Sequence, residues 1–537
     1  MMGATVTVND LLDGHVALDV QCLDRIYLNG YVPNLQVPGQ VVSFMTTHLG
    51  LPLPSPAIME KIGTAFRRSV RKFADTRGVP VVKFAKGVRK VEVMRRYLNA
   101  QAKTGASGVA AIGVAQEYQN VYASSERQGR NGMPWFSFHK ADRRVTCFYF
   151  YLWDADFGPG FIKVCAYFPY PVKVWLNGHE WAKRQATLAG IGFTELSNGF
   201  ATCDDPAALQ AICDRLGPEV IGAFFDRWMS VLPLPLTDHD RSAGYWWELS
   251  MRQVEVSRTI VFDAPRQARA FFEALVVDNL DIGRPESVEL IFTGPPKRGR
   301  PFKIGCQPKT KVVTRDTDVT VNAFFKHSRL KQYLKDGRAL RIETVINCPD
   351  DLQCHRRLIH LHELQSKARD VNARLLDTER VGQGCVLASP AFERVAQSTL
   401  TEDGRRSPAL RFGDPRVMAL LGALCVGLNA LGFTNRSLRA QVSHLLGVPY
   451  TVNQMSYDLA RLRSNGLIGR RPGANTYDLT PDGQRVAIFY TKVHDRLLRP
   501  LIAANTRPAP LELRQALRTI DRHVRGYIDT ARLGTAA

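Results

Sequence analysis

The chain has 537 residues, with 71 Lys and Arg against 50 Asp and Glu, which gives a formal net charge of +21. A surplus of this size indicates attraction to a polyanion such as nucleic acid and carries no information about the fold. No apolar run approaches the roughly 18 residues of a membrane span, and the N-terminus lacks the charged and apolar regions of a secretion signal. We therefore expect a cytoplasmic protein of roughly two to four domains.

The ten cysteines are scattered along the chain and form no CxxC pair. This spacing argues against a zinc finger or a disulfide framework and is typical of a reducing compartment. The sequence also lacks the motifs GxxxxGKS/T, GxSxG and HExxH. A P-loop ATPase, a hydrolase with a nucleophile elbow and a zinc protease are therefore not indicated.

In the first predicted region, residues 1–134, helical and strand-like patterns alternate, which favours an α/β arrangement. The amphipathic segment 55–78 predicts a helix with a basic face, and 90–105 predicts a second helix. Short apolar runs at 78–87 and 106–117 predict strands between and after these helices.

The second predicted region, residues 135–236, begins with the densest strand pattern in the chain. An apolar strand ends in Asp154-Ala155-Asp156, and a Gly-Pro-Gly turn leads into the next strand. Two carboxylates at the end of such a strand resemble the first strands of ribonuclease-H-like nucleases and transposases. The resemblance implies that Asp154 and Asp156 hold Mg²⁺ or Mn²⁺ for attack on a phosphate. The alternative is that both aspartates only accept hydrogen bonds from the backbone of the turn.

The third predicted region, residues 237–400, combines strands and helices with a basic stretch. Tyr333 precedes the strand-like segment 339–347, in which Arg341 and Glu343 share a face by the period of two. This order is similar to a segment of phage and plasmid rolling-circle replication initiators. The similarity implies that Tyr333 attacks a DNA phosphate and that Glu343 is a metal ligand.

Those initiators also need two histidines on a strand, and the only such triplet here, His360-Leu361-His362, lies in a helical pattern. Helical residues two positions apart point about 200° apart, so they cannot bind one ion together. The alternative is that Tyr333 packs, Glu343 pairs with an arginine, and basic side chains bind backbone phosphates. Those basic side chains are Lys331, Lys335, Arg338 and Arg341.

The basic charge is concentrated between Lys297 and Glu343, a stretch with 13 Lys and Arg and only 4 Asp and Glu. Within it, Lys297-Arg298-Gly299-Arg300-Pro301 resembles the AT-hook of chromatin proteins. The resemblance implies that Arg298 and Arg300 extend along a narrow minor groove. The alternative is a charged loop between two strands, which can also contact phosphate.

Residues 408–505 contain the parts of a winged helix, namely three helices followed by a basic hairpin and a closing helix. Winged helices place the third helix in the major groove and the hairpin on phosphate or in the minor groove. Protein docking is the alternative use of this fold. The predicted caps and turn residues are Asp414-Pro415, Thr434 or Asn435, Gly447, Thr451 and Asn465-Gly466.

The exposed positions of the third helix and the hairpin supply the candidate DNA contacts. Arginine is the usual ligand of phosphate and guanine, and the amides of Asn and Gln can bind adenine. The third helix offers Asn453, Gln454, Tyr457, Arg461 and Arg463, and the hairpin offers Arg470 and Arg471. Residues 506–537 form the last predicted region, a helical tail.

Residues 149–185 and 333–347 are similar to a widespread, uncharacterised bacterial protein family with a C-terminal winged helix. This similarity implies a bacterial setting and supplies no catalytic residue.

We therefore predict an α+β fold, with a mixed α/β body of antiparallel-rich sheets and a C-terminal winged-helix domain. The preferred function is DNA binding with metal-dependent processing, such as nicking, strand transfer or replication initiation of a mobile element, with Mg²⁺ or Mn²⁺ as cofactor. The alternative is a non-enzymatic DNA- or RNA-binding regulator or architectural protein without a cofactor. DNA is favoured over RNA as the partner, no membrane contact is expected, and a homodimer is compatible with the sequence.

Overall fold

The computed structural model describes most of the chain between residues 14 and 494. The described residues are 12, 14–128, 134–273, 287–291, 309–315, 318–381, 390–400, 406–425 and 432–494, with 515–516, 519–520, 522–523 and 526 near the C-terminus. None of the helices in these ranges is both long and apolar enough to cross a membrane.

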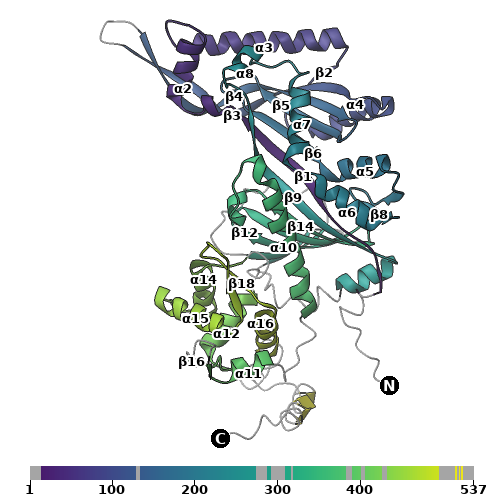
Figure 1. The fold of residues 1–537 in the computed structure, drawn as a ribbon, viewed down its shortest axis with the longest axis vertical. Helices are drawn as coiled ribbons and strands as arrows, with labels where there is room; N and C mark the ends of the chain where they lie inside the picture. Colours follow the sequence, from purple (N-terminus) through teal and green to yellow (C-terminus); the bar gives the residue numbers. More distant parts are fainter. Residues whose placement is uncertain are drawn as a thin grey trace.

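Twelve strands of the described residues form one continuous mixed sheet through the body of the protein (Figure 1). Neighbouring strands are antiparallel except for the pairs β10–β11 and β2–β3, so the predicted α+β body with antiparallel-rich pairing is confirmed. The sheet takes strands from all three predicted body regions. In spatial order the strands are β10 (Ser287–Ile291), β11 (Lys309–Arg315), β12 (Asp318–Phe325), β13 (Ser328–Lys335), β14 (Ala339–Ile346), β9 (Glu248–Phe262), β1 (Val16–Tyr31), β6 (Val172–Asn177), β5 (Gly158–Cys165), β4 (Pro134–Asp154), β3 (Gly108–Gln128) and β2 (Val81–Lys83).

The N-terminal strand β1 lies at the centre of the sheet, between β9 and β6. The sequence analysis did not predict this strand, although its first half alternates apolar and polar residues. A bulge between Leu23 and Ile26 interrupts the alternation by placing two residues, Asp24 and Arg25, opposite Glu255 alone. The first residues of the chain therefore carry side chains into the middle of the body.

The two faces of the sheet contact different helices because successive side chains on a strand point in opposite directions. On β4, Phe148 and Phe150 enter a large core that also includes residues of α3, α7 and α10. Tyr149 and Tyr151 point the other way, into a smaller core under α4. The helices of the body are α2 (Pro38–Ser43), α3 (Pro56–Arg77), α4 (Lys90–Thr104), α5 (Gly178–Leu188), α6 (Pro206–Arg215), α7 (Pro218–Met229), α8 (Asp238–Ser242) and α10 (Leu361–Val381).

Short elements complete the body. His360 and His362 lie in consecutive helical turns, which confirms that this triplet is helical and not on a strand. The short elements are η1 (Pro33–Leu35), η2 (Phe44–His48), η3 (Pro349–Leu352), η4 (Leu358–His360) and the hairpin of β7 (Phe193–Glu195) and β8 (Phe200–Cys203).

The C-terminal unit has its own apolar core, which is built mainly from four helices and a hairpin. The predicted caps are confirmed: Thr434 and Thr451 each form a capping box, and Gly447 ends its helix with a positive φ of 70°. The elements are α11 (Pro390–Ala396), β15 (Thr399–Leu400), β16 (Arg406–Ser407), α12 (Pro415–Cys425), α14 (Asn435–Leu446), α15 (Val452–Ser464), β17 (Ile468–Arg470), β18 (Tyr477–Leu479) and α16 (Pro481–Val493).

The C-terminal unit contacts the body through its hairpin. Arg374 of α10 forms an ion pair with Asp478 of β18 at 2.6 Å, and Gln353 donates a hydrogen bond to the Thr476 hydroxyl. The hairpin is therefore held against the sheet-bearing part of the molecule.

Candidate nucleic-acid interface and buried charge network

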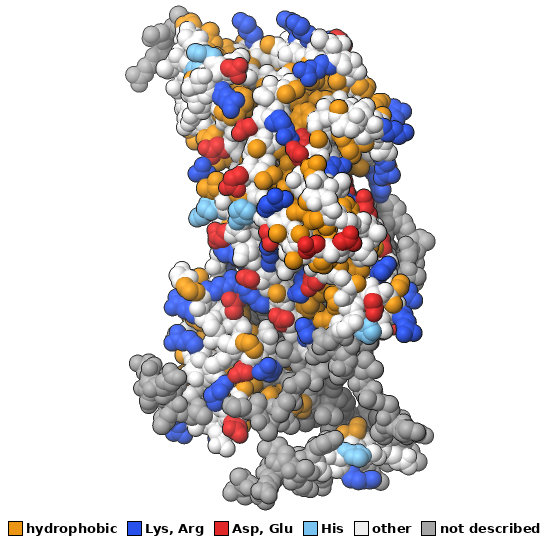
Figure 2. Space-filling view, turned by 45° about the vertical axis from the view of Figure 1, so that its right-hand side comes forward, with side chains coloured by type: hydrophobic (Ala, Val, Ile, Leu, Met, Phe, Trp, Pro, Cys, Tyr) orange, Lys and Arg blue, Asp and Glu red, His pale blue; other side chains and the backbone are white. Residues whose placement is uncertain are grey.

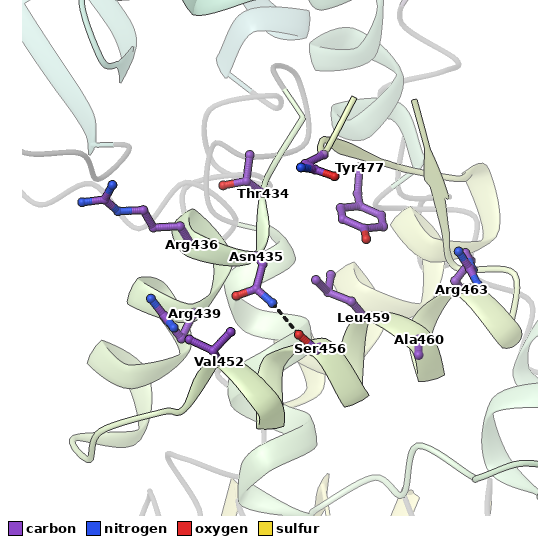
Figure 3. A pocket seen from close by; sticks show the side chains of 11 residues that line it. Thr434, Asn435, Arg436, Arg439, Val452, Ser456, Leu459, Ala460, Arg463 and Tyr477 are labelled. Atoms are coloured by element: carbon purple, nitrogen blue, oxygen red, sulfur yellow. Dashed lines mark hydrogen bonds between the residues drawn. The ribbon is translucent and has the colours of Figure 1, made fainter. Parts of the chain in front are cut away.

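A groove of about 570 Å³ opens between α14, α15 and the β17–β18 hairpin (Figure 3). Asn435, at the start of α14, donates a hydrogen bond to the Ser456 hydroxyl of α15 at 3.0 Å and closes the floor of the groove. The hairpin contributes Asn475 and Tyr477. The groove thus combines a helix N-terminus, the side of a second helix and a hairpin edge.

Three arginines line this groove: Arg436 and Arg439 from α14 and Arg463 from α15. Arg436 and Arg463 are exposed, and Arg439 is half-buried. Among the residues that the structure describes, no carboxylate lies within ion-pair distance of any of the three. The groove therefore presents positive charge that the protein itself does not neutralise.

The third-helix candidates divide between the groove and the interior. Arg463 lines the groove, and Asn453 is exposed at the start of α15. Gln454 is exposed, but its side chain accepts a hydrogen bond from the backbone N–H of Thr451 at 2.8 Å. The prediction that Arg461 contacts DNA is corrected. Its side chain is mostly buried, and its guanidinium donates hydrogen bonds to the backbone carbonyls of Pro408 and Ala409.

The two hairpin arginines differ: Arg471 is paired with a carboxylate, which corrects its prediction as a phosphate ligand, whereas Arg470 is exposed and has only neutral acceptors among the described residues. Arg470 donates to the carbonyl of Ala474 at 2.9 Å and to the Asn475 side chain, so it holds the hairpin turn. Arg471 forms an ion pair with Asp478 at 2.7 Å. The other predicted DNA ligands, Arg298 and Arg300, lie outside the described residues.

A buried ion pair fixes α15 against α12. Asp458 is fully buried and accepts from Arg416 at 2.9 Å and from the Tyr450 hydroxyl. Burial raises the pKa of Tyr450, and its hydrogen bond to Asp458 raises it further. These contacts fix the orientation of α15 relative to α12, and thereby determine which side of α15 is exposed.

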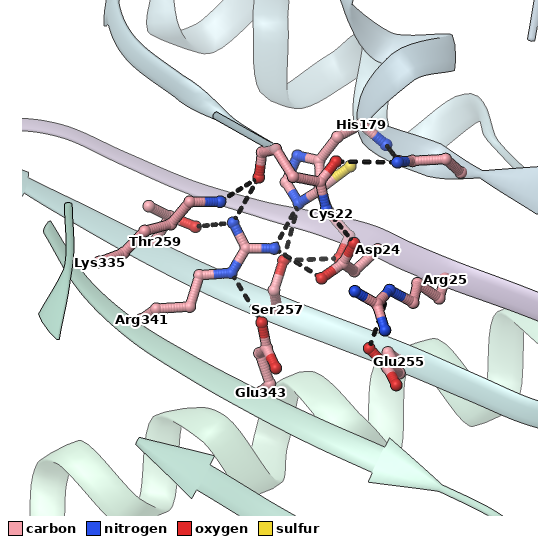
Figure 4. Close-up of polar contacts among 12 residues, drawn as sticks. Cys22, Asp24, Arg25, His179, Glu255, Ser257, Thr259, Lys335, Arg341 and Glu343 are labelled. Carbon is pink, nitrogen blue, oxygen red and sulfur yellow. Dashed lines mark hydrogen bonds and ion pairs between the residues drawn. The ribbon is translucent and has the colours of Figure 1, made fainter. Parts of the chain in front are cut away.

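A second polar cluster lies inside the body, around Arg341 on β14 (Figure 4). The Arg341 side chain is completely buried. Burial would lower its pKa, but the charges of Asp24 and Glu343 outweigh burial and raise the pKa above its usual value. The acceptors of its guanidinium are Asp24 at 2.7 Å, Glu343 at 3.1 Å, His179 at 2.8 Å, Thr259 at 3.2 Å and the Asn198 carbonyl at 2.9 Å.

His179, at the start of α5, is a neutral member of this cluster. Burial, and then the charge of Arg341, lower the pKa of His179 well below its usual value. The imidazole is therefore neutral, and its Nε2 accepts the Arg341 hydrogen bond. The proton consequently sits on Nδ1.

Arg341 and Glu343 share a face of β14, as the period of two predicted, and Tyr333 on the neighbouring strand β13 also contacts Glu343. The Tyr333 hydroxyl donates to Glu343 at 2.8 Å, and Lys331 contacts the other carboxylate oxygen at 2.7 Å. Burial would raise the pKa of Glu343, but Lys331 and Arg341 hold it below its usual value. Burial raises the pKa of Tyr333, and so does the charge of Glu343.

Asp24, Glu255 and Glu343 form a buried acidic triad whose oxygens lie within 4.8 Å of one another. Arg341 and Lys331 already bind the carboxylates of Asp24 and Glu343. Burial raises the pKa of Glu255, whose cationic partner Arg25 is 3.8 Å away. These donors do not fit a Mg²⁺ or Mn²⁺ site, because two cations already take the oxygens that a divalent ion would bind.

The predicted metal set of Asp154, Asp156 and Glu343 needs correction, because four strands lie between β4 and β14. Asp154 is fully buried and accepts backbone hydrogen bonds from Asp156 and Phe157 at 3.0 and 3.1 Å. Its second oxygen binds Arg227 and the Trp228 ring N–H, both at 2.7 Å. Asp156 pairs with Arg227 at 3.2 Å. Asp154 therefore acts in turn formation, the alternative given for it, whereas the Asp156 side chain forms an ion pair beside the turn.

Lys331 and Lys335 of β13 face inward, which corrects their prediction as phosphate ligands, whereas Arg338 in the following turn is half-buried. Lys331 pairs with Glu343, and Lys335 is buried against the Asn198 carbonyl. Burial, and then the charge of Arg341, lower the pKa of Lys335 to about 8. Arg338 donates to the carbonyl of Phe262 at 3.4 Å.

The sequence analysis missed Arg436 and Arg439, whose spacing of three on the polar side of α14 was the available signal. It also missed Asp24 and Glu255, because they meet Glu343 only through strand pairing. No family model matches the chain, and no curated protein or solved structure is similar to it.

Proposed function

We propose that this protein binds duplex DNA through a C-terminal winged helix formed by α12, α14, α15, the β17–β18 hairpin and α16. The element order and the capped helices support this assignment. The main observation in its support is that Arg436, Arg439 and Arg463 have no carboxylate partner among the described residues, unlike other arginines of this unit. They converge on one groove, whereas Arg461 and Arg471 are bound within the protein.

Each part of the groove has a role in this proposal. The N-terminus of α14 and Arg436 attract a backbone phosphate, because the helix dipole favours an anion there. The outer face of α15 enters the major groove with Asn453 and two exposed apolar side chains, Val452 and Tyr457, which can contact thymine methyl groups. Arg463 then binds phosphate at the far end of α15.

The hairpin acts as a fixed wing in this proposal. Arg470 stabilises its turn, and Asp478 bridges it to both Arg471 and Arg374 of α10. A wing that is already attached to the body loses little freedom on binding, so it can place Asn475 beside the DNA at low entropic cost.

The geometry favours the non-enzymatic alternative over DNA cutting. Tyr333 is largely buried and donates a hydrogen bond to Glu343, and Arg341 and Lys331 bind the carboxylates of Asp24 and Glu343. A reaction at Tyr333 would require this network to open. We therefore propose a DNA-binding regulator or architectural protein, with the buried network stabilising the body.

The proposal is tested by fluorescence anisotropy with a labelled DNA duplex across a salt series. The variant replaces Arg436, Arg439 and Arg463 by Gln. We expect weaker duplex binding and a log–log salt slope that is smaller by about three, because three phosphate contacts are lost.

The matched control replaces Arg68, Arg71 and Lys72 on the exposed basic side of α3 by Gln, which removes the same charge. It should keep the wild-type slope. Equal losses in both variants would show that net charge alone drives binding, and they would overturn the assignment of the groove.

A further inference from the structure

Four aromatic side chains form a row across the face of the sheet that carries α4. They come from four neighbouring strands and stand directly opposite one another in the strand register. The aromatic row consists of Tyr151 on β4, Phe161 on β5, Trp175 on β6 and Tyr27 on β1. Adjacent strands lie about 4.8 Å apart, so the row extends over about 14 Å.

Neighbouring rings contact one another from Tyr151 to Trp175, and the ring in contact with Tyr27 is that of Phe161. Phe161 and Trp175 are nearly parallel, with centroids 6.1 Å apart and an interplanar angle of 8°. Tyr151 lies 5.6 Å from Phe161 at 50°, and Tyr27 lies 6.3 Å from Phe161 in an edge contact. Phe161, Trp175 and Tyr27 are only half-buried, so part of each ring remains accessible.

The row continues into a cavity of about 660 Å³ between α4 and α5. Tyr151, Phe161 and Trp175 form its aromatic wall, and Arg95 and Asn99 of α4 lie on its other side. This volume is typical of sites that hold a small organic ligand, and the lining also includes polar groups such as Asn177 and the carboxylate of Glu180.

Cations surround the accessible end of the row. Lys173 and Arg252 each lie 5.7 Å from the centre of the Tyr27 ring, and the side chain of Arg25 is 57% exposed. Within the described part of the chain, no carboxylate pairs with Lys173 or Arg252. Figure 2, which turns the right-hand side of Figure 1 forward, shows Lys and Arg side chains mixed with hydrophobic and acidic ones on that face of the molecule.

The charged form of Lys173 is disfavoured by burial and by neighbouring cations, and Glu117 offsets part of this effect. Burial, and then the charges of Arg252 and Lys163, lower the pKa of Lys173 to about 8. A bound anion would relieve this repulsion.

We propose that the aromatic row and its cations bind single-stranded DNA, with unpaired bases stacked on Trp175, Phe161 and Tyr27 and with phosphates beside Arg25, Lys173 and Arg252. Aromatic rings interleaved with cations bind single strands with little sequence preference, because every base has a flat face. Duplex DNA cannot use the row, because its bases already stack on one another. The length of the row fits several consecutive bases and exceeds a single nucleotide.

This inference rests on the proposed DNA binding but concerns a different surface. Single-strand binding at the aromatic row and duplex binding at the groove can therefore be disproved independently. The full chain is tested by anisotropy with a labelled oligo-dT and with a duplex. We expect Trp175→Leu to weaken oligo-dT binding about tenfold, the effect of losing one base stack, and to leave duplex binding unchanged. Trp135→Leu is the matched control, because Trp135 is 51% exposed and is not part of the row.

A second variant, Lys173→Gln with Arg252→Gln, tests the site without altering the aromatic packing. It should also weaken oligo-dT binding and reduce its salt dependence, whereas the groove variant at Arg436, Arg439 and Arg463 should affect the duplex alone. If the double variant is folded and binds oligo-dT with the affinity of the wild-type protein, the inference is overturned. Binding of oligo-U in place of oligo-dT, or saturation by a free mononucleotide as tightly as by the strand, would overturn it too.

Discussion

Arginine has opposite roles in the two halves of this molecule. In the body, Arg341 is completely buried, and five acceptors surround its guanidinium. In the C-terminal unit, Arg436, Arg439 and Arg463 border an open groove, and no carboxylate among the described residues pairs with them. The same side chain is a structural element in one place and a candidate ligand for phosphate in the other.

The comparison teaches that local charge density does not locate a binding surface. The stretch with the largest surplus of Lys and Arg includes β13 and β14, whose Lys331, Lys335 and Arg341 turn inward. A buried cation must be neutralised because its desolvation is costly, whereas an exposed cation can remain unpaired until a partner arrives. The partners of each arginine therefore reveal more than its position in the sequence.

The substitution Arg341→Met gives the strongest test of the difference between the buried arginine and the groove arginines. We expect the free energy of unfolding to fall by about 3–5 kcal/mol, because Asp24 and Glu343 would remain buried without their main cation. Urea denaturation followed by tryptophan fluorescence measures the change. Arg436→Met is the matched control and should stay within about 0.5 kcal/mol of wild type. A loss below about 1 kcal/mol for Arg341→Met would contradict a structural role for the network.

A smaller effect is expected from Glu117→Gln in acid. Burial would raise the pKa of Glu117, but hydrogen bonds from Lys163 and Lys90 lower it to about 2. A depressed carboxyl pKa stabilises the fold above the unfolded value of 4.5 and loses that contribution as pH falls toward 2. Because Glu117 is only half-buried, we expect a contribution of roughly 1–2 kcal/mol. The difference in unfolding free energy between wild type and variant should be smaller at pH 3 than at pH 6 and should vanish only below about pH 2, and a constant difference would contradict this origin.

The pH dependence of single-strand binding tests whether Lys173, a partly buried cation, contacts the bound phosphate. Lys173 has a pKa of about 8 and faces Lys163, Arg252, Tyr27, Glu117 and Cys147. It is charged below that pH and loses its charge as the pH rises through it, so oligo-dT affinity should fall a few-fold between pH 7 and 9. Lys173→Arg should remove this fall, because arginine stays charged. An unchanged pH profile in the arginine variant would separate Lys173 from the bound phosphate.

The smallest expected effect concerns metal ions. Arg341 and Lys331 bind two members of the acidic triad, so millimolar Mg²⁺ or Mn²⁺ should leave the melting temperature of the wild-type protein unchanged. A ligand that binds only the folded state would raise that temperature. A clear rise that is lost in Glu343→Gln, together with metal-dependent nicking of supercoiled DNA, would restore the enzymatic alternative.

Local patterns in the sequence predicted the elements that depend on near neighbours. The capping threonines 434 and 451, the stop at Gly447 and the apolar stripes of α14 and α15 were all identifiable, because caps and helix faces involve residues within about four positions. The pairing of Arg341 with Glu343 on one face followed from strand periodicity. The central strand β1 escaped prediction because its bulge breaks that periodicity.

The sequence by itself determined the net charge, the helix boundaries of the C-terminal unit and the alternation of the main strands. Only the tertiary structure decided which charged side chains stay free. Asp24 and Arg341 are 317 residues apart along the chain, and strands β1, β9 and β14 bring them to 2.7 Å. No local pattern encodes such a contact, because it depends on strand pairing between distant segments, and that same pairing assembles the aromatic row.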